Sequence, residues 1–407
     1  MKDGLKIAVI GGGAAGFFAA LSVKEHFPNY SITIFEKSNK LLSKVKISGG
    51  GRCNVTNATF DVKELASNYP RGENFLKKAF GQFNVKDTIE WFEERGVPLE
   101  TLSDNCIFPK SNTSQSIIDC FISNAKKKEI EIKMKSGVDK IETVENGFRL
   151  FSQDNEFIYD KVIITTGGQP KITGLMWLED LGHSIVKPLP SLFTFNMPKN
   201  PICELMGNVV EDTTVKVEGT KLIAKGPLLV THWGMSGPAI LKLSAWGARI
   251  LEDKGYQFSI LVNWLNNKKA EDVQFLIEKI VKENGDKKVI NFNPFPMTNR
   301  LWSFILDKSS ISIHLKWKEI GKKSLNKLIN NLLNDRYEVS GKTTFKEEFV
   351  TAGGVSLTNV NVQKMESKVI PGVFFAGEVL DIDGITGGFN FQSAWTTAYI
   401  AGKSVGI

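Results

Sequence analysis

The sequence has few of the residues that usually bind metals or form disulfide bonds. Among 407 residues it contains four cysteines and four histidines. No two cysteines form a CxxC pair, and the histidines are scattered without the spacing of metal ligands. The pattern therefore predicts no bound metal and excludes both a zinc knuckle and a thioredoxin-reductase-like disulfide relay.

Long apolar runs are also missing. No stretch of about eighteen apolar residues occurs, so no transmembrane helix and no membrane partner are expected. The amino terminus leads directly into an apolar strand and shows neither the hydrophobic region nor the cleavage site of a signal peptide. The expected location is therefore cytoplasmic. Hydrophobic residues make up 42% of the chain, which is typical of a globular protein with room for two domains.

The net charge is +7. Excess positive charge favours polyanionic partners such as nucleic acid, or an anionic cofactor. The alternative is a lysine-rich surface that only contacts solvent. Lysines occur along the whole chain, with small clusters at 126–128 and 322–327, and they form no basic tail. Charge alone leaves both interpretations open.

The amino terminus carries a dinucleotide-binding fingerprint. An apolar strand at 6–10 is followed by glycines at 11, 13 and 16, and then by a predicted helix over 17–26. In this motif Gly11 permits the tight turn, Gly13 lets the backbone approach a pyrophosphate, and Gly16 lets the helix pack on the strand. The helix amino terminus then offers N–H groups to the phosphates.

A second strand, predicted over 31–35, ends at Glu36. This carboxylate comes twenty residues after Gly16, where an acidic side chain binds the ribose hydroxyls of the nucleotide. NAD and FAD use the same fingerprint, so these residues do not decide which dinucleotide is bound.

A glycine-rich segment follows at 44–57. Three consecutive glycines at 49–51 favour neither a helix nor a strand, so we expect an unusual backbone conformation. The surrounding serine, arginine, asparagine and threonine side chains supply many hydrogen-bond donors. Such a loop can wrap a pyrophosphate or an isoalloxazine ring, and the alternative is a flexible surface loop.

Two later segments are typical of a return to the cofactor. A strand over 161–166 ends at Gly167 and Gly168, and the segments 129–134, 140–144, 147–151 and 157–159 before it predict a β-meander. A second strand over 372–378 ends at Glu378, and a helix is predicted over 392–401. This strand resembles the G-x-x-F-A-G-D segment of FAD enzymes, and the resemblance implies that the amino terminus of the helix faces the flavin pyrimidine ring and stabilises negative charge there.

The middle of the chain predicts short strands and two amphipathic helices. The strands are expected over 193–195, 209–210, 214–217 and 221–223, and the helices over 272–283 and 325–334. The turn-rich segment 231–239 either faces the flavin or has a structural role. No second GxGxxG motif is present, so NADH or NADPH would dock transiently, or the substrate itself would be the reductant.

Four motifs together resemble one family. SGGGRCNVTN (48–57), GPLLVTHWGMSGPAIL (226–241), TAGGV (351–355) and GEVLDIDGITGGFNFQSAW (377–395) resemble the BaiN/RdsA family of NAD(P)/FAD-dependent oxidoreductases, also called aminoacetone oxidase family flavoproteins. The resemblance implies an α/β fold with a doubly wound, Rossmann-like FAD-binding domain of the two-dinucleotide-fold type. Residues 1–190 and 341–407 would form this domain. An inserted β-barrel-like and helical domain would span 191–340, with its helical part at about 267–335.

The resemblance also implies hydride transfer from reduced flavin to a conjugated C=C bond. One branch of the family is associated with bile-acid metabolism, and another with dihydrouridine in 23S ribosomal RNA. The positive charge favours the RNA branch, with NADH or NADPH as reductant. Two alternatives stay open, namely an oxidase, dehydrogenase or ene reductase acting on a small unsaturated metabolite, and a non-catalytic flavin-bearing RNA-binding protein.

The candidate site residues fall into two groups. Cys53 and His232 are candidate proton donors, although a cysteine is as often a small packed residue and a lone histidine is usually structural. If Cys53 is the acid, Cys53→Ala slows turnover on the order of a hundredfold. The expected FAD-binding residues are Gly11, Gly13, Ala14, Ala15, Gly16, Glu36, Lys37, Lys44, Ser48, Gly49, Gly50, Gly51, Arg52, Asn54, Val138, Thr166, Gly167, Gly168, Gly377, Glu378, Gly387, Gly388, Phe389 and Asn390.

Overall fold

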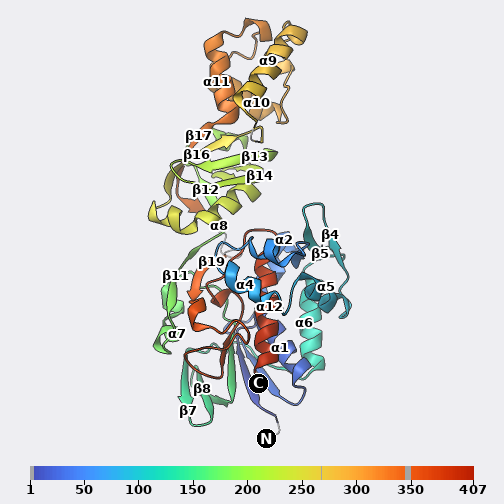
Figure 1. The fold of residues 1–407 in the computed structure, drawn as a ribbon, viewed down its shortest axis with the longest axis vertical. Coiled ribbons are helices and arrows are strands. Elements are labelled where there is room, and N and C mark those ends of the chain that lie inside the picture. Colours follow the sequence, from blue (N-terminus) through green and yellow to red (C-terminus); the bar gives the residue numbers. More distant parts are fainter. Residues whose placement is uncertain (1–3, 267, 344–349) are drawn as a thin grey trace. The chain divides into compact units, whose positions relative to one another are not determined.

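The computed structural model describes residues 4–266, 268–343 and 350–407 (Figure 1). The chain divides into two compact units. One combines Met1–Ser191 with Phe345–Ile407, and the other consists of Leu192–Thr344. The first unit thus draws on both ends of the sequence, whereas the second is one continuous segment.

A five-stranded parallel sheet forms the centre of the first unit, in the order β20-β10-β1-β2-β6. Apolar β-branched residues dominate β1 and β10, as expected for strands that are covered on both faces. The strands are β1 (Lys6–Ile10), β2 (Ser31–Phe35), β6 (Glu131–Lys133), β10 (Lys161–Ile164) and β20 (Val373–Phe375). This sheet confirms the predicted doubly wound α/β fold.

Two long helices from opposite ends of the sequence pack together in this unit. Helix α1 (Ala14–His26) contacts α12 (Phe389–Ser404), and the Ser22 hydroxyl donates a hydrogen bond to the Tyr399 carbonyl at 2.9 Å. Aromatic rings fill the space around them, with Phe18 and Trp395 centroids 5.4 Å apart. Both helices begin three residues before their predicted starts, because each helix starts directly after a glycine turn.

The predicted β-meander is wrong in its first strand. The meander consists of β7 (Lys140–Val144), β8 (Gly147–Ser152) and β9 (Asn155–Tyr159). The segment predicted at 129–134 instead contributes β6, which extends the parallel sheet beside β2. The reason is that helix α6 (Gln115–Lys127) returns the chain to the sheet edge, where the Thr33 hydroxyl donates to the Glu131 carboxylate at 2.8 Å.

Smaller elements complete the first unit. The helices are α2 (Ser43–Gly51), α3 (Val62–Ala66), α4 (Glu73–Ala79), α5 (Val85–Glu93) and α7 (Met176–Asp180). A small three-stranded sheet has the order β3 (Thr56–Asn57), β5 (Cys106–Pro109) and β4 (Leu99–Thr101). A two-stranded sheet pairs β11 (Ile185–Pro190) with β19 (Thr351–Val355).

The second unit contains a seven-stranded antiparallel sheet in the order β17-β16-β13-β14-β15-β12-β18. Strand β12 also contacts β17 near the opposite end of this order, so the sheet curves strongly. The strands are β12 (Thr194–Asn196), β13 (Val209–Val217), β14 (Ile223–Thr231), β15 (Gly234–Ser236), β16 (Gln257–Asn263), β17 (Asp335–Ser340) and β18 (Lys342–Thr343).

Two local predictions for this unit are corrected. The predicted strands 209–210 and 214–217 form one strand, β13, because an irregularity between Val210 and Thr213 interrupts only the pairing register. The predicted turn-rich segment 231–239 contains the short strand β15 and the first turn of α8 (Pro238–Asp253). Pro238 suits this position because the first turn of a helix needs no N–H donor there.

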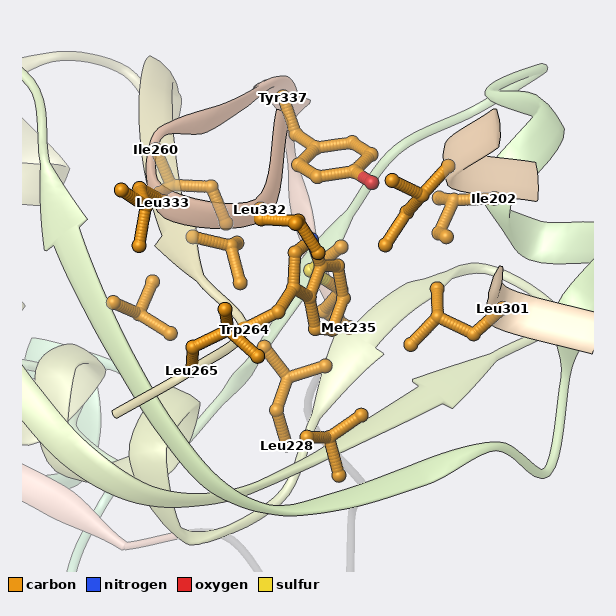
Figure 2. Packing of buried hydrophobic residues seen from close by; sticks show 14 of the residues in the cluster. Ile202, Leu228, Met235, Ile260, Trp264, Leu265, Leu301, Leu332, Leu333 and Tyr337 are labelled. Atoms are coloured by element: carbon orange, nitrogen blue, oxygen red, sulfur yellow. The ribbon is translucent and has the colours of Figure 1, made fainter. Parts of the chain in front are cut away.

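Three helices follow the sheet strand β16, namely α9 (Ala270–Asn284), α10 (Asn299–Lys308) and α11 (Lys322–Leu333). We call residues 268–334 the helical module. Its buried face continues into the sheet core, where Trp264 packs among Ile260, Leu301 and Leu332 (Figure 2). The Trp264 indole donates a hydrogen bond to the buried Asp335 carboxylate at 3.0 Å. The module and the sheet therefore share one core.

Candidate active site

The turn between β1 and α1 has the backbone that its glycines predict. Gly11 has a φ of 117°, and a Cβ there would lie 2.4 Å from the Thr165 carbonyl oxygen. A Cβ on Gly16 would lie 1.9 Å from the Gly11 oxygen, so the helix packs on the turn at backbone distance. A Cβ on Gly13, in contrast, would meet no atom within 4 Å. The last position is the one at which a pyrophosphate can approach the backbone.

The amino terminus of α1 carries no side-chain cap and no acidic residue in its first turn. Its N–H groups therefore keep their positive partial charge for an anionic ligand. Glu36 ends β2 beside this turn, and its carboxylate accepts hydrogen bonds from the N–H groups of Gly12 at 2.9 Å and Ser38 at 2.8 Å. These bonds fix the carboxylate next to the phosphate-binding turn.

Val138 and Lys37, two further predicted residues, lie near Glu36. The Ser136 N–H donates to the Glu36 carbonyl at 2.8 Å, and a Cβ on Gly137 would approach the Lys37 Cβ to 3.0 Å. The segment after β6 therefore lies against the end of β2. Sheet order explains this neighbourhood, since the carboxyl ends of parallel strands meet at one edge.

The glycine-rich segment begins as a short helix and leaves helical geometry at its glycines, so the predicted unusual backbone conformation is confirmed. The helix α2 spans Ser43–Gly51, but Gly49 and Gly50 within it adopt left-handed φ values of 56° and 68°. Cβ atoms on Gly50 and Gly51 would meet nothing within 4 Å, so this backbone is open on one side. Arg52 lies over the Phe108 ring at 4.3 Å from its centroid. These contacts hold the segment in place while its glycine backbone stays accessible.

Asn54 connects the glycine-rich segment to α12. In the amide orientation that satisfies its neighbours, Asn54 donates to the Thr56 carbonyl at 2.9 Å and accepts from the Gly388 N–H at 3.2 Å. Asn57 donates to the Gly387 carbonyl at 3.0 Å. Residues more than 300 positions apart in the sequence therefore form one surface around the α12 amino terminus.

Glu378 lies at the centre of a second contact set. Its carboxylate accepts from the Thr351 N–H at 2.9 Å and pairs with the Lys44 ammonium at 2.6 Å. A Cβ on Gly168 would come within 2.6 Å of the same carboxylate, which explains the glycine there. Gly377 completes the set, since a Cβ on it would lie 2.7 Å from the Ala15 Cβ at the start of α1.

Two buried hydroxyls beside these residues have no hydrogen-bond partner within the described chain. They are the Thr166 Oγ1, two residues after β10, and the Thr351 Oγ1 at the start of β19. Buried hydroxyls usually bond to protein, water or ligand, so both are positioned for a polar group from outside the chain. Thr166 was a predicted ligand, whereas sequence reasoning missed Thr351, although it opens the TAGGV motif.

The amino terminus of α12 has the features predicted for a flavin neighbour. Gly387 and Gly388 have φ values of 123° and 93°, and the helix begins at Phe389 without a side-chain cap or an acidic first turn. The Asn390 amide, a predicted FAD contact, forms two hydrogen bonds within the chain. It donates to the Gly384 carbonyl and accepts from the Gly384 N–H, both at 2.9 Å, and so closes the loop before the helix.

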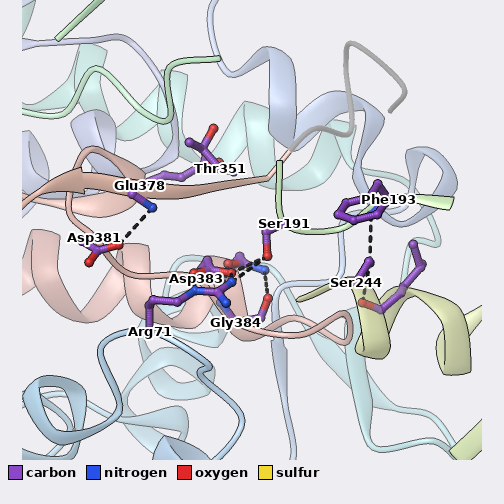
Figure 3. A network of polar contacts seen from close by, with 12 residues as sticks. Arg71, Ser191, Phe193, Ser244, Thr351, Glu378, Asp381, Asp383 and Gly384 are labelled. Carbon is purple, nitrogen blue, oxygen red and sulfur yellow. Dashed lines mark hydrogen bonds and ion pairs between the residues drawn. The ribbon is translucent and has the colours of Figure 1, made fainter. Parts of the chain in front are cut away.

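A buried ion pair anchors this loop (Figure 3). The Arg71 Nε donates to the Asp383 Oδ1 at 2.6 Å, and the Arg71 Nη2 donates to the Ser191 hydroxyl at 3.0 Å. The Ser191 hydroxyl donates in turn to Asp383. Burial raises the pKa of Asp383, and the neighbouring guanidinium opposes that rise. The sequence reasoning missed Arg71, since no motif surrounds it.

The two predicted proton donors differ in exposure. The Cys53 thiol is 0% exposed, and burial raises its pKa to about 12. The thiol is therefore protonated but has no open path to a substrate, which favours a packing role. His232 belongs to the second unit, where its exposed ring lies 4.1 Å from the centroid of Trp233. Neither role has been tested by these contacts, and both stay predictions.

The sequence matches the family described as HI0933-like protein Rossmann domain over residues 5–404. The chain therefore belongs to this family and is an FAD-dependent oxidoreductase, as its sequence motifs predicted. This membership favours an enzyme over the alternative of a non-catalytic RNA-binding protein.

Two curated relatives align over almost the full length of both chains. The 3-dehydro-bile acid delta(4,6)-reductase of Clostridium scindens is 25% identical and covers 98% of this chain and 98% of its own. The ribosomal RNA dihydrouridine synthase of Escherichia coli is 26% identical and covers 98% of this chain and 97% of its own.

The fold also resembles a solved structure, that of 3-ketosteroid delta1-dehydrogenase from Sterolibacterium denitrificans in complex with 1,4-androstadiene-3,17-dione. The TM-score is 0.52 at 10% sequence identity, with 99% of both chains covered. At this identity the likeness concerns the fold alone.

The residues of the first unit fit FAD. The open Gly13 backbone and the uncapped α1 terminus suit a pyrophosphate, and Glu36 suits a ribose. The orphaned hydroxyls of Thr166, after β10, and Thr351, at the start of β19, add two polar groups. Among the described residues, no group of three or more potential metal ligands occurs, and no helix is long and apolar enough to span a membrane.

Proposed function

We propose that this protein reduces a conjugated C=C bond, that its substrate is uridine in 23S ribosomal RNA, and that the product is dihydrouridine. NADH or NADPH would supply the electrons. The observation that carries the proposal is the full-length similarity to two proteins whose names each describe addition of hydrogen across a C=C bond. The net charge of +7 favours the RNA substrate over an uncharged metabolite.

Bound FAD would supply the hydride-transfer chemistry, and the chain would supply position and electrostatics. The first turns of α1 and α12 would stabilise negative charge on the pyrophosphate and on the ring system, respectively. Gly387 and Gly388 would let that ring approach the α12 backbone, and the Arg71–Asp383 pair holds the preceding loop. Thr351, Thr166 and Glu378 would bind the ribitol chain that joins the pyrophosphate to the ring system.

Reduction also requires a proton at the carbon next to the one that accepts hydride. His232 is exposed and Cys53 is buried, so we propose His232 as the donor to test first. The uracil would have to be unpaired or flipped out of its helix to reach the ring, because a stacked base is not accessible to an active site.

A small unsaturated metabolite is the second candidate substrate. The bile acid reductase is as similar to this chain as the dihydrouridine synthase is, at 25% and 26% identity over the same length. A conjugated enone accepts hydride at its β-carbon in the same way as uracil does. The same flavin site therefore serves either substrate.

Deletion of the gene, followed by mass spectrometry of 23S ribosomal RNA, tests the proposal. We expect one dihydrouridine to disappear in the deletion strain and to return when the wild-type gene is restored. A dihydrouridine that persists in the deletion strain would contradict the RNA substrate. The search would then turn to conjugated enones, with the FAD site unchanged.

A further inference from the structure

The net charge of the protein is concentrated in the helical module. Residues 268–334 contain thirteen lysine and arginine residues against seven aspartate and glutamate residues, a net charge of +6. The whole chain carries +7, so the other residues together contribute only +1. Lysines occur throughout the sequence, but the excess of positive charge does not. The cause of the excess positive charge is therefore to be sought in the residues of the helical module.

Two basic segments lie side by side at one edge of the module. The segment at 285–289 pairs with the segment at 315–318, with the Trp317 N–H bonded to the Lys287 carbonyl at 3.1 Å. An isolated bridge also joins Lys288 to Lys316. Asp286 pairs with Lys316 at 3.4 Å and Lys318 at 2.6 Å. The Glu319 carboxylate also accepts from the Lys316 N–H at 2.8 Å. Two carboxylates thus lie among four lysines.

Helix α11 begins four residues after Lys318 and is also basic. Its apolar side chains Leu328, Leu332 and Leu333 are buried, and the helix contacts β16 and β17 (Figure 2). Its exposed positions 322, 323, 326, 327 and 330 carry only lysine and asparagine, and the sequence Lys322–Leu333 contains no acidic residue.

Two of these lysines lower the stability of helix α11. Lys322 and Lys323 occupy the first turn of α11, where the helix dipole is positive and acidic residues are favoured. When charges that destabilise a helix are present in a protein, a bound ligand of opposite charge can compensate for the lost stability. The compensating charge must be negative.

We propose that these residues form an RNA-docking surface, which we call the lysine surface: Lys287, Lys288, Lys316, Lys318, Lys322, Lys323 and Lys327. The inference rests on the proposed RNA substrate and names the part of the chain that binds it. Lysine ammonium groups contact phosphates as point charges and read no sequence. The lysine surface therefore holds structured RNA by its backbone, and selection of the uridine belongs to the FAD-containing unit.

The test compares two triple variants of the full-length, FAD-loaded protein. One is Lys322→Gln, Lys323→Gln, Lys327→Gln in the lysine surface. The matched control is Lys126→Gln, Lys127→Gln, Lys128→Gln at the end of α6, which removes the same charge from the other unit. Affinity for transcribed 23S ribosomal RNA is measured at several salt concentrations, together with FAD content and thermal unfolding of each variant.

We expect the lysine-surface variant to bind RNA at least about tenfold more weakly than the control variant does. Each lost phosphate contact lowers the salt dependence of log K by about 0.7 to 0.9, so the slope should fall by about two. FAD content should match that of the control, and the unfolding temperature should not fall below that of the control, because Lys322 and Lys323 oppose the dipole of α11. Equal RNA affinity and equal salt slope in the two variants would overturn the lysine surface.

Two further outcomes separate this inference from the proposed function. If the lysine-surface variant binds RNA as the wild type does and dihydrouridine is still formed, the surface is wrong and the function stands. If no dihydrouridine forms but the variant still loses RNA affinity, the function fails and the surface stands. Wild-type binding to phosphatidylglycerol vesicles in preference to RNA would also overturn the surface.

Discussion

At the scale of the residue, the glycines of the β1–α1 turn have separate physical roles. Gly16 is required because the helix touches the turn, with 1.9 Å between a Cβ at this position and the Gly11 oxygen. Gly13 has an extended backbone with a φ of −94° and open space where a Cβ would be. Packing of the fold therefore requires Gly16, whereas we propose that the cofactor requires Gly13.

The paired variants Gly16→Ala and Gly13→Ala test this separation. Gly16→Ala should destabilise the protein by about 3 kcal/mol or more, because backbone atoms must move to admit the methyl group. Gly13→Ala should cost at most about 1 kcal/mol, as for other amino-terminal helix caps, but should lower FAD content strongly. Urea unfolding of the apoprotein and flavin absorbance measure the two effects. A Gly13→Ala protein with full FAD content would contradict the assignment.

The proton donor is a second question at this scale. Because the Cys53 thiol is buried, Cys53→Ala should keep turnover close to that of the wild type. His232→Gln should slow turnover by about a hundredfold, which is the usual contribution of a general acid. Single-turnover reoxidation of the reduced enzyme by substrate measures both. A hundredfold loss in Cys53→Ala with normal FAD content would instead restore the cysteine as the acid.

The buried His183 predicts a pH dependence of stability. Its Nδ1 lies 3.2 Å from the Leu178 carbonyl, so Nδ1 donates and Nε2 accepts from the Ser367 hydroxyl at 2.8 Å. That hydroxyl already accepts from the N–H groups of Val369 and Ile370. Burial lowers the pKa of His183, so the folded state favours the neutral ring.

Since the unfolded histidine has a pKa of about 6.5, its stabilising contribution is complete above that pH and is lost as the pH falls below it. Between pH 7.5 and 5.5 the wild type should therefore lose up to about 1 kcal/mol more stability than His183→Gln loses. Urea unfolding at the two pH values measures this difference. Parallel pH profiles for the two proteins would show that His183 is protonated equally in both states.

The sequence was most informative about residues whose roles depend on neighbours in the chain. The glycines at 11, 13 and 16 and the acid at 36 follow from spacing alone. Arg71 and Thr351 do not, since their partners Asp383 and Glu378 are 312 and 27 positions away. Contacts at such separations depend on the tertiary fold, and one sequence does not reveal them.

At the scale of the element, periodicity predicted the amphipathic helices α9 and α11 but missed others with one apolar face, such as α5 and α6. The predicted bounds of α9 and α11 lie within three residues of the observed bounds. Helices α8 and α10 were not predicted, and α8 begins within a segment interpreted as a loop because of its glycines and proline. Strand β6 was assigned to the wrong sheet, because three residues of strand pattern do not specify which partner they pair with.

The loop that precedes α12 depends on the Arg71–Asp383 ion pair, which predicts a large effect at this scale. Asp383→Ala should destabilise the protein by about 3–5 kcal/mol, because it leaves a guanidinium in a largely buried site without its partner. The exposed pair Lys140–Glu142 offers a control, and Glu142→Gln should not change stability measurably.

Urea unfolding measures the two variants under identical conditions. FAD content should also fall in Asp383→Ala, since the loop positions the amino terminus of α12. If Asp383→Ala and Glu142→Gln were equally stable and retained equal FAD, the ion pair would not anchor this loop.

At the scale of the whole molecule, the family resemblance carried most of the prediction. Spacing indicated a dinucleotide fold at the amino terminus, and the strand ending at Glu378 indicated a return to the cofactor, but four separate motifs were needed to identify the family. The predicted boundaries at 190 and 341 compare with unit boundaries at Ser191 and Thr344. The concentration of charge in residues 268–334 was not recognised from the total, because a net charge does not show where the excess lies.

The most direct measurement is an anaerobic reaction of purified, FAD-loaded protein with NADPH or NADH and 23S ribosomal RNA from the deletion strain. A steroid enone with a conjugated C=C bond serves as the competing substrate. We predict that the RNA gains one dihydrouridine, detected by mass spectrometry, while the enone is reduced slowly or not at all. Rapid reduction of the enone with no dihydrouridine in the RNA would contradict the central claim.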